Sequence, residues 1–485
     1  MFQQQFHSVV ARNPHKTAVI DNLGTARTYG ELLQDIEQLR ARLHATGLRE
    51  GDVVATQLDN SIGYVALLLA LASLGLVHCP INTASSADHR AMRLDQVRAT
   101  VLITEQGVIP EGLEVPGFAL SSTRPTAEPA PERHGFTGLM RMQETSGSTG
   151  TPKLALWRQD SLFREIMHWV QWAQLASSDR HLNIHTLDGG HAVDLHVFPA
   201  LLTGATLYLG DAGQVAENLK TLAEHRITVM SALPSQYLEL AHHSQQQGIR
   251  LPALSSPFCG GAYLDDQVVV QTERCLGVKI KRIYGSTEFG MILANFDTGL
   301  QVSCGMRPVG DVNVELAVLD PAQPDIGEII ARSSHRGSGY FPLPANLVED
   351  DAYRSGDIAQ RLVDGSLMPL GRSTDALLTR RGTQFAPALE GRIAQELMLE
   401  RAVVLVDPHD RHRADVVIQA DAARAHGLQT RLCAMLDELG VRAGIAALER
   451  IPLTPTGKPD RARLRKQLSA RHTAKDAFTY LKDLI

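Results

Sequence analysis

The sequence predicts an α/β fold with largely parallel sheets, followed by a smaller α+β domain at the C-terminus. Short apolar runs rich in β-branched residues alternate with segments of helical periodicity, which favours an α/β architecture. The chain has 485 residues, more than a single hydrophobic core usually supports. From about Gly371 the pattern restarts with shorter elements, and this restart predicts the second domain.

The clearest helix signal begins at Thr28. Thr28-Tyr29-Gly30-Glu31 has the Thr-x-x-Glu form of a capping box. Apolar residues then recur at helical spacing until Gly47, namely Leu32, Leu33, Ile36, Leu39 and Leu43. The most apolar run, YVALLLALASLGLVHC at 64–79, is shorter than the roughly 18 to 20 residues that a membrane-spanning helix needs. We therefore expect an amphipathic helix after Thr28 and a buried helix within 64–79.

Strands are predicted in both parts of the chain. In the first part they are DVVATQL (52–58), ATVLIT (99–104), ATLYLG (205–210) and ITVMSAL (227–233). In the second part RAVVLVD (401–407) and ADVVIQA (414–420) read as strands, and LQTRLCAMLDELG (428–440) reads as a helix. Residues 108–135 are rich in proline, glycine and small polar residues, which predicts a surface connection.

Composition excludes several classes. The formal net charge is −6, so there is no basic excess to neutralise nucleic-acid phosphates, and we expect no nucleic acid as the main partner. The five cysteines are widely spaced without a CxxC pair, which argues against a zinc or redox motif and favours reduced cysteines in the cytoplasm. The N-terminus lacks the cationic and apolar regions of a secretory signal.

The segment TSGSTGTPK at 145–153 is the densest cluster of small and hydroxylated residues, and it ends in a lysine. Backbone N–H groups and hydroxyls can bind phosphate oxygens while the cation offsets their charge. A Walker loop is excluded because Pro152 precedes Lys153 and no serine or threonine follows the lysine. A phosphate-binding loop and a plain linker both remain open at this point.

Five further motifs follow that loop in order. They are YGSTEFG (284–290), GEIIARSSHRGSGYF (327–341), YRSGD (353–357), GRSTD (371–375) and PLTPTGKPDR (452–461). Together the six motifs resemble the adenylate-forming superfamily, which includes acyl- and aryl-CoA ligases, peptide-synthetase adenylation domains and luciferases. The resemblance spans nearly the whole chain.

The resemblance implies a fold and a reaction. The fold would be a large N-terminal domain of stacked α/β subdomains with a small β-barrel part (1–370), a hinge (371–375) and a small mobile α+β C-terminal domain (376–485). A carboxylic acid would attack the α-phosphorus of ATP in the presence of Mg²⁺, releasing pyrophosphate. The acyl-adenylate would then pass to a phosphopantetheine thiol of CoA or of an acyl or peptidyl carrier protein. An ATP-dependent kinase or hydrolase and a nucleotide-binding paralogue without turnover are the rival classes.

The same resemblance implies roles for individual residues. The phosphate loop would use Thr145, Ser146, Gly147, Ser148, Thr149, Gly150 and Lys153. Gly261, Ala262, Tyr284, Gly285 and Ser286 would contact the nucleotide, with Tyr284 along the adenine ring. Thr287 would contact the α-phosphate and Glu288 would bind Mg²⁺. Asp357 and Arg372 would bind the ribose, and Lys458 would bridge the carboxylate and the α-phosphate.

Two positions depart from the family pattern. The hinge residue, usually acidic or lysine, is Thr374 here, so either Thr374 or the neighbouring Asp375 serves as the hinge. A lysine expected a few residues later is replaced by Leu378. Contacts to the thiol partner in that region are therefore not predicted.

The acid substrate is predicted from DGGHAVDLHVFPALLTGATLYL at 188–209. His191 stands where α-amino-acid adenylation domains carry an aspartate for the substrate amine, and acyl- and aryl-acid ligases commonly have histidine there. This favours an aryl or fatty acid, whereas the nearby Asp194 keeps a stand-alone amino-acid adenylation enzyme as the alternative. Other pocket positions by the same alignment are Leu195, Gly260, Ile283, Met291 and Ile292, which are mostly apolar.

Overall fold

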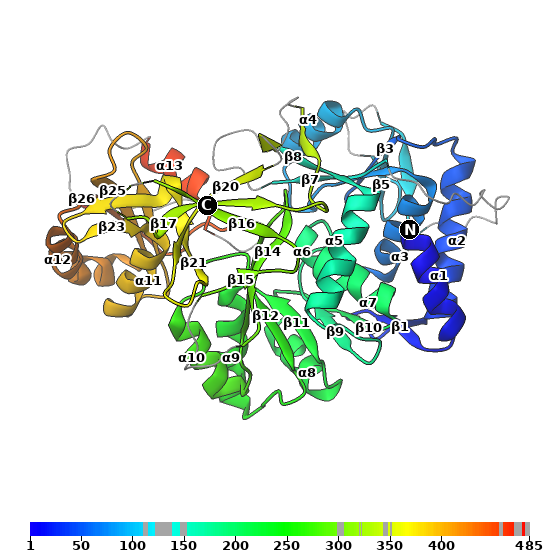
Figure 1. The fold of residues 1–485 in the computed structure, drawn as a ribbon, viewed down its shortest axis with the longest axis horizontal. Coiled ribbons are helices and arrows are strands. Elements are labelled where there is room, and N and C mark those ends of the chain that lie inside the picture. The colour runs from blue at the N-terminus through cyan, green and yellow to red at the C-terminus, as the bar shows by residue number, and fades with distance from the viewer. Residues whose placement is uncertain are drawn as a thin grey trace. The chain divides into compact units, whose positions relative to one another are not determined.

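A computed structural model describes residues 1–109, 115–121, 138–145, 153–297, 305–319, 321, 323–342, 348–349, 352–454, 459–469 and 478–480. The chain divides into two compact units. The first comprises Met1–Ser303, Arg307–Asn313 and Ala331–Tyr353, and the second comprises Cys304–Met306, Val314–Ile330 and Arg354–Ile485. Strands and helices alternate along most of the chain (Figure 1).

A nine-stranded sheet dominates the first unit. Its order is β15 (Arg307–Pro308), β14 (Gly290–Asn295), β13 (Lys281–Ser286), β12 (Ser256–Cys259), β11 (Val229–Ala232), β9 (Arg180–Asn183), β10 (Thr206–Leu209), β1 (Thr17–Ile20) and β2 (Ala26–Thr28). The pairs from β13 through to β1 are parallel, and the pairs at both ends of the sheet are antiparallel.

A seven-stranded sheet in the same unit contains β7 and β8, the two strands that flank the predicted phosphate loop in sequence. Its order is β18 (Gly339–Phe341), β8 (Leu154–Arg158), β7 (Leu139–Glu144), β4 (Val77–Pro80), β3 (Val53–Thr56), β5 (Val101–Thr104) and β6 (Gly117–Ala119). Pairs from β7 to β6 are parallel, while β7–β8 and β8–β18 are antiparallel. The predictions of an α/β fold with largely parallel sheets and of the four strands in this part of the chain are confirmed.

The helices of the first unit cover the sheets. They are α1 (Phe2–Arg12), α2 (Tyr29–Ala45), α3 (Ile62–Leu74), α4 (Ala87–Val97), α5 (Gln159–Trp172), α6 (Gly190–Ala192), a π-helical turn (Val193–Val197), α7 (Phe198–Thr203), α8 (Val215–Glu224), α9 (Pro234–Gln247) and α10 (Asp266–Leu276). The largest core joins side chains of both sheets to α1, α2, α3, α5 and α7. A second core joins β9, β11 and β12 to α8, α9 and α10, which lie together along that sheet in Figure 1.

Local sequence signals explain the boundaries of α2 and α3. The predicted capping box is present, since the Thr28 side chain accepts from the Glu31 N–H and Glu31 accepts from the Thr28 N–H. The predicted buried helix within 64–79 is confirmed as α3, Ile62–Leu74. The last residues of that apolar run, 77–79, belong to β4 instead. Gly75 ends the helix in the left-handed region at φ 69°, where a side chain would be strained. Within the described residues, no helix combines the length and apolar character that crossing a membrane requires.

The second unit carries smaller elements. Its strands include β16 (Asn313–Val318), β17 (Ile326–Arg332), β20 (Ala352–Arg361), β21 (Leu367–Arg372), β22 (Ala376–Thr379), β23 (Gly382–Phe385), β24 (Ala402–Val406), β25 (Arg413–Gln419), β26 (Arg442–Leu448) and β27 (Phe478–Tyr480). Its helices are α11 (Ala386–Glu396), α12 (Ala422–Leu439) and α13 (Arg461–Ser469). The strands expected at 401–407 and 414–420 are β24 and β25, and they pair antiparallel.

The helix expected at 428–440 begins earlier than predicted. It starts at Ala422, because the Asp421 side chain caps it by accepting from the Arg424 N–H. It packs in a core with α11, β24 and β25. The expected boundary at 370 and the hinge at 371–375 stay predictions. Most of the expected connection at 108–135 lies outside the described residues.

Candidate active site

The ends of the predicted phosphate loop are joined by an antiparallel strand pair. β7 and β8 pair with Glu144 opposite Leu154. The Thr145 N–H donates to the Lys153 carbonyl at 3.0 Å, which extends the ladder by one residue. Ser146, Gly147, Ser148, Thr149 and Gly150 lie outside the described residues. Thr145 and Lys153 are thus brought together, while the loop's contacts to phosphate stay a prediction.

Tyr340 links Lys153 to Glu288. β18 pairs with β8 and places Tyr340 opposite Ala155. The Lys153 ammonium nitrogen lies 5.1 Å from the centroid of the Tyr340 ring, within cation–π range. The Tyr340 hydroxyl donates to Glu288 Oε1 at 3.0 Å. The sequence did not single out Tyr340, although it lies within the GSGYF end of the motif at 327–341.

The turn that carries Thr287 and Glu288 is fixed by its backbone. It joins β13 to β14, and Trp157 Nε1 donates to the Thr287 carbonyl at 2.8 Å. The Gly337 N–H donates to the Glu288 carbonyl at 3.1 Å. A Cβ at Gly285 would lie 2.3 Å from the Gly290 carbonyl oxygen, so this position of the hairpin has no room for a side chain. The turn that carries the Thr287 and Glu288 side chains is therefore fixed by hydrogen bonds to its backbone carbonyls.

Three histidines converge on Ser231, a buried residue of β11. His196 Nε2 accepts from the Ser231 N–H at 3.1 Å, and His185 Nε2 lies 3.1 Å from the Ser231 carbonyl oxygen. The Ser231 hydroxyl lies 2.7 Å from His191 Nε2. Burial lowers the pKa of His196 well below its usual value, which keeps Nε2 available as an acceptor. Ser231 thereby orients His191, a relation that sequence spacing gave no sign of.

The predicted acyl-pocket residues fall into two groups. A Cβ at Gly261 would lie 3.6 Å from His191 Nδ1, and one at Gly260 would lie 2.6 Å from Ile283, so these four residues lie close together. Met291 and Ile292 are buried within β14, and Leu195 packs at the edge of the largest core. Ala262 is exposed next to Gly261.

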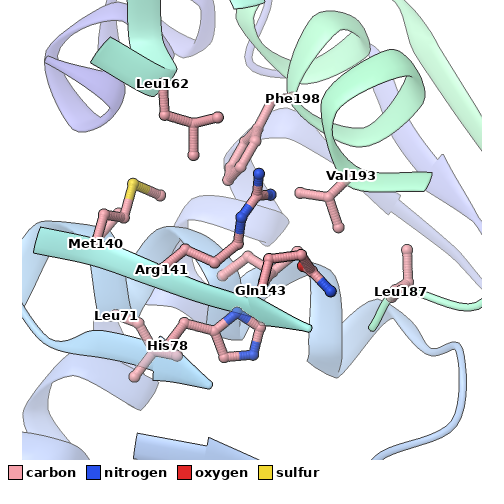
Figure 2. Close-up of a pocket in the computed structure, with 11 residues that line it drawn as sticks. Leu71, His78, Met140, Arg141, Gln143, Leu162, Leu187, Val193 and Phe198 are labelled. Atoms are coloured by element: carbon pink, nitrogen blue, oxygen red, sulfur yellow. The ribbon is translucent and has the colours of Figure 1, made fainter. Parts of the chain in front are cut away.

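The Asp194 carboxylate forms an ion pair with Arg141. Arg141 on β7 donates from Nη1 to Asp194 Oδ1 at 2.7 Å and from Nη2 to Oδ2 at 2.6 Å. The Arg141 side chain is 5% exposed and that of Asp194 is 20% exposed. Figure 2 shows Arg141 extending into a pocket toward Phe198 and Val193, with His78 on the neighbouring strand. The pocket is therefore lined by the arginine of a bidentate ion pair that the sequence did not predict.

In the second unit, Asp357 and Arg372 are brought together. They are direct partners in the β20–β21 pairing, and Arg372 Nε lies 3.4 Å from Asp357 Oδ1. Thr374 and Asp375 lie in the 3-10 turn Ser373–Asp375. Lys458 lies outside the described residues.

We expect Ser231→Ala to raise the KM for the acid about 10-fold while leaving the KM for ATP unchanged. The substitution removes one hydroxyl partner of His191, and a side-chain hydrogen bond contributes about 0.5–1.5 kcal/mol. Steady-state pyrophosphate release measures both constants. Ser256→Ala, at another buried strand serine, is the control and should change neither. An equal rise in both KM values would remove Ser231 from acid selection.

We also expect the stability of the first unit to fall as the pH is lowered from 7.5 to 5. Burial, and to a lesser extent the charge of Arg141, lowers the pKa of His78 to about 3. The folded ring stays neutral while the unfolded chain takes up a proton below about pH 6.5, so stability present above pH 6.5 is lost toward pH 3. The slope is at most about 1.4 kcal/mol per pH unit for one histidine. Urea midpoints should fall less steeply in His78→Gln, and identical slopes would contradict this origin.

Similarity to known protein families identifies the family of this chain. A family model described as AMP-binding enzyme matches residues 6–341. The chain belongs to the AMP-binding enzyme family. The resemblance to adenylate-forming enzymes is thereby confirmed, and the rival kinase or hydrolase class is set aside.

Relatives of this AMP-binding enzyme include proteins of similar length and much longer proteins. It is 27% identical to a feruloyl-CoA synthase of Amycolatopsis sp, over 94% of this chain and 96% of the relative. It is 26% identical to tyrocidine synthase 3 of Brevibacillus parabrevis, over 95% of this chain but only 7% of that protein. The chain therefore matches nearly the whole of one relative and a small part of the other.

Solved structures establish the fold. The O-succinylbenzoate coenzyme A synthetase MenE of Bacillus subtilis, in complex with ATP and magnesium, superimposes with a TM-score of 0.84 at 20% identity, covering 95% of this chain and 99% of that one. The amide bond synthetase McbA of Marinactinospora thermotolerans gives 0.79 at 22% identity, covering 96% and 100%. The expected large N-terminal α/β region and small C-terminal α+β region are confirmed.

Proposed function

We propose that this AMP-binding enzyme activates an amine-free carboxylic acid, an aryl or fatty acid, as its acyl-adenylate. A carboxylate oxygen would form a bond to the α-phosphorus of ATP, and pyrophosphate would leave with the electrons of the broken P–O bond. The acyl group would then pass to a phosphopantetheine thiol of CoA or of an acyl carrier protein, with AMP as the leaving group. The observation that carries the choice of acid is the ion pair between Arg141 and Asp194.

An α-amino acid would need a carboxylate to pair with its ammonium. Asp194 is the acidic residue that the sequence analysis held open for this role, but both of its oxygens accept from Arg141. Turning Asp194 toward an ammonium would leave the buried Arg141 cation without its partner, which is costly in a low-dielectric site. His191 is held by Ser231 and cannot supply a full negative charge. The arrangement thus favours an acid without an amine.

Other residues would bind the nucleotide. Lys153 would offset phosphate charge, Asp357 and Arg372 would bind the ribose, and Thr287 would contact the α-phosphate. Lys458 would approach the reacting carboxylate, and Thr374 or Asp375 would act as the hinge. Both anionic reactants need charge screening and alignment more than covalent catalysis.

Glu288 suits the proposed Mg²⁺ site. A carboxylate provides the oxygen ligands that Mg²⁺ prefers, and the Tyr340 hydroxyl fixes one of them. Mg²⁺ would supply charge screening for the triphosphate when bound. Among this chain's own groups, Tyr340 would orient the Glu288 carboxylate, and the Lys153 ammonium lies over the Tyr340 ring.

The test is ATP- and Mg²⁺-dependent pyrophosphate release across benzoates, cinnamates, short and long fatty acids, and α- and β-amino acids, with hydroxylamine to trap the adenylate. We expect turnover with amine-free acids. Turnover confined to amino acids would instead establish a stand-alone amino-acid adenylation enzyme that loads a peptidyl carrier protein. ATP binding without pyrophosphate release from any acid would contradict both.

The thiol acceptor is tested separately. Coenzyme A and a carrier-bound phosphopantetheine share the reactive arm, and the name of the relative feruloyl-CoA synthase supports CoA. Thioester formation from a preformed acyl-adenylate should be measured with each acceptor in turn. A cytoplasmic location, where both acceptors and ATP occur, remains the expectation from the cysteine pattern.

A further inference from the structure

A second group of ionisable side chains lies on α5 and the segment that follows β17. Glu165 and His168 lie one turn apart on α5, and His335 comes from residues 333–337. The ligand-type atoms of these three residues all lie within 4.8 Å of one another. The side chains of Glu165 and His335 are each 5% exposed. All three belong to the first unit.

Two of these side chains are hydrogen-bonded to each other, and each has a further hydrogen-bond partner outside the cluster. His335 Nδ1 lies 2.7 Å from Glu165 Oε2, and His335 Nε2 lies 2.9 Å from Asp311 Oδ1. The other oxygen of Glu165, Oε1, accepts from the Met291 N–H at 2.7 Å. Asp311 is 64% exposed, so the group can be reached from solvent at that side.

The His168 side chain makes no hydrogen bond to the described residues. Both ring nitrogens are buried and find no hydrogen-bond partner among the described residues. Its Nε2 lies 3.4 Å from Asp311 Oδ1, and its ring centroid lies 4.4 Å from that of His335. A Cβ at Gly310 would lie 1.7 Å from His168 Nε2, so the backbone there packs closely against the imidazole. An unsatisfied buried imidazole is costly and calls for a partner.

We propose that Glu165, His168 and His335 form a binding site for a divalent transition metal of the zinc class. Two imidazole nitrogens and one carboxylate oxygen are a donor set typical of zinc and unlike the all-oxygen set of Mg²⁺. His335 would ligate through Nδ1, with the metal taking the place of the proton shared with Glu165 Oε2, while its Nε2–H donates to Asp311 in the carboxylate–histidine pairing that orients metal-binding imidazoles. The Met291 N–H would orient the Glu165 carboxylate in the same way.

The bound metal would stabilise the segments that hold the backbone of Glu288, the proposed Mg²⁺ ligand. It would tie α5 to residues 333–337, and Gly337 of that segment donates to the Glu288 carbonyl. It would also fix Glu165, which holds the start of β14 through Met291. The site is separate from the substrate-associated Mg²⁺, and its existence does not depend on which acid the enzyme activates.

The test uses the full chain, stripped with a chelator, dialysed, and titrated with Co²⁺ and with Zn²⁺. We expect one equivalent of Co²⁺ to give visible d–d absorption that one equivalent of Zn²⁺ abolishes, and Zn²⁺ to raise the thermal midpoint. His168→Gln should weaken Zn²⁺ binding at least about 100-fold, and Asp311→Asn about 10-fold to 100-fold. His242→Gln, at an exposed histidine of α9, should bind as tightly as the unmodified chain.

Two results would overturn the site. One is the absence of stoichiometric Co²⁺ or Zn²⁺ binding by the unmodified chain. The other is equal binding by the His168→Gln and His242→Gln variants, which would place the metal elsewhere. If His168→Gln does not fold, Glu165→Gln replaces it, because the amide still accepts from the Met291 N–H but is a poor metal ligand. Binding should also weaken as the pH is lowered, since the imidazoles must be deprotonated to ligate.

Discussion

Glu288→Gln is expected to lower the rate of pyrophosphate release by about 100-fold or more. The amide keeps the size of the side chain and can still accept from the Tyr340 hydroxyl, but it loses the negative charge that would hold Mg²⁺. A loss of about 2.7 kcal/mol of transition-state stabilisation corresponds to 100-fold in rate. The measurement is the initial rate at saturating ATP and acid over a range of Mg²⁺ concentrations.

Two companion variants separate charge from position. Tyr340→Phe removes only the hydrogen bond to Glu288 and should cost about 10-fold. Glu217→Gln, at an exposed position of α8, should leave the rate unchanged. If Glu288→Gln retained the full rate with an unchanged Mg²⁺ dependence, Glu288 would be excluded as the metal ligand.

Arg141→Met is expected to destabilise the first unit by about 3–5 kcal/mol, because it leaves the partly buried Asp194 carboxylate without its partner. The double variant Arg141→Met with Asp194→Leu should recover most of that loss, since replacing both partners by apolar groups is often neutral. Thermal and urea midpoints of the three chains measure the effect. A double variant no more stable than Arg141→Met would show that the ion pair is not the cause.

The same variant tests the choice of acid. With Arg141 gone, the Asp194 carboxylate can pair with an ammonium, so Arg141→Met should gain measurable turnover of amino acids relative to amine-free acids. The ratio of kcat/KM for a matched pair of substrates, with and without the amine, reports this change. A ratio that does not move would show that Asp194 lies outside the acid pocket.

Local signals made much of the fold predictable. The capping box at Thr28 and the helical spacing after it lie within a few residues of one another, and they produce the same helix wherever the segment packs. The runs that became β3, β5, β10 and β11 are likewise short and continuous. The exact bounds of α3 were not predicted, because an all-apolar run carries no periodicity that marks where a helix begins or ends.

The contacts of the site were predictable only in part. Motif order singled out Lys153 and Glu288, but Tyr340, which contacts both, comes from a segment whose register the sequence does not reveal. Arg141 and Asp194 are 53 residues apart, and His335 and Glu165 are 170 apart. Such pairs depend on which segments lie side by side, so neither the Arg141–Asp194 ion pair nor the cluster of Glu165, His168 and His335 had a local signature.

The three histidines around Ser231 have a consequence for redesigning the enzyme. Two of them contact its main-chain N–H and carbonyl groups, which every residue type except proline would retain, and only His191 depends on the side chain. A library confined to position 231, with alanine, cysteine and threonine in place of serine, would therefore adjust one contact of His191 in the proposed acid pocket and leave the main-chain contacts of β11 in place. We therefore expect changes at this residue to alter the choice of acid without preventing folding.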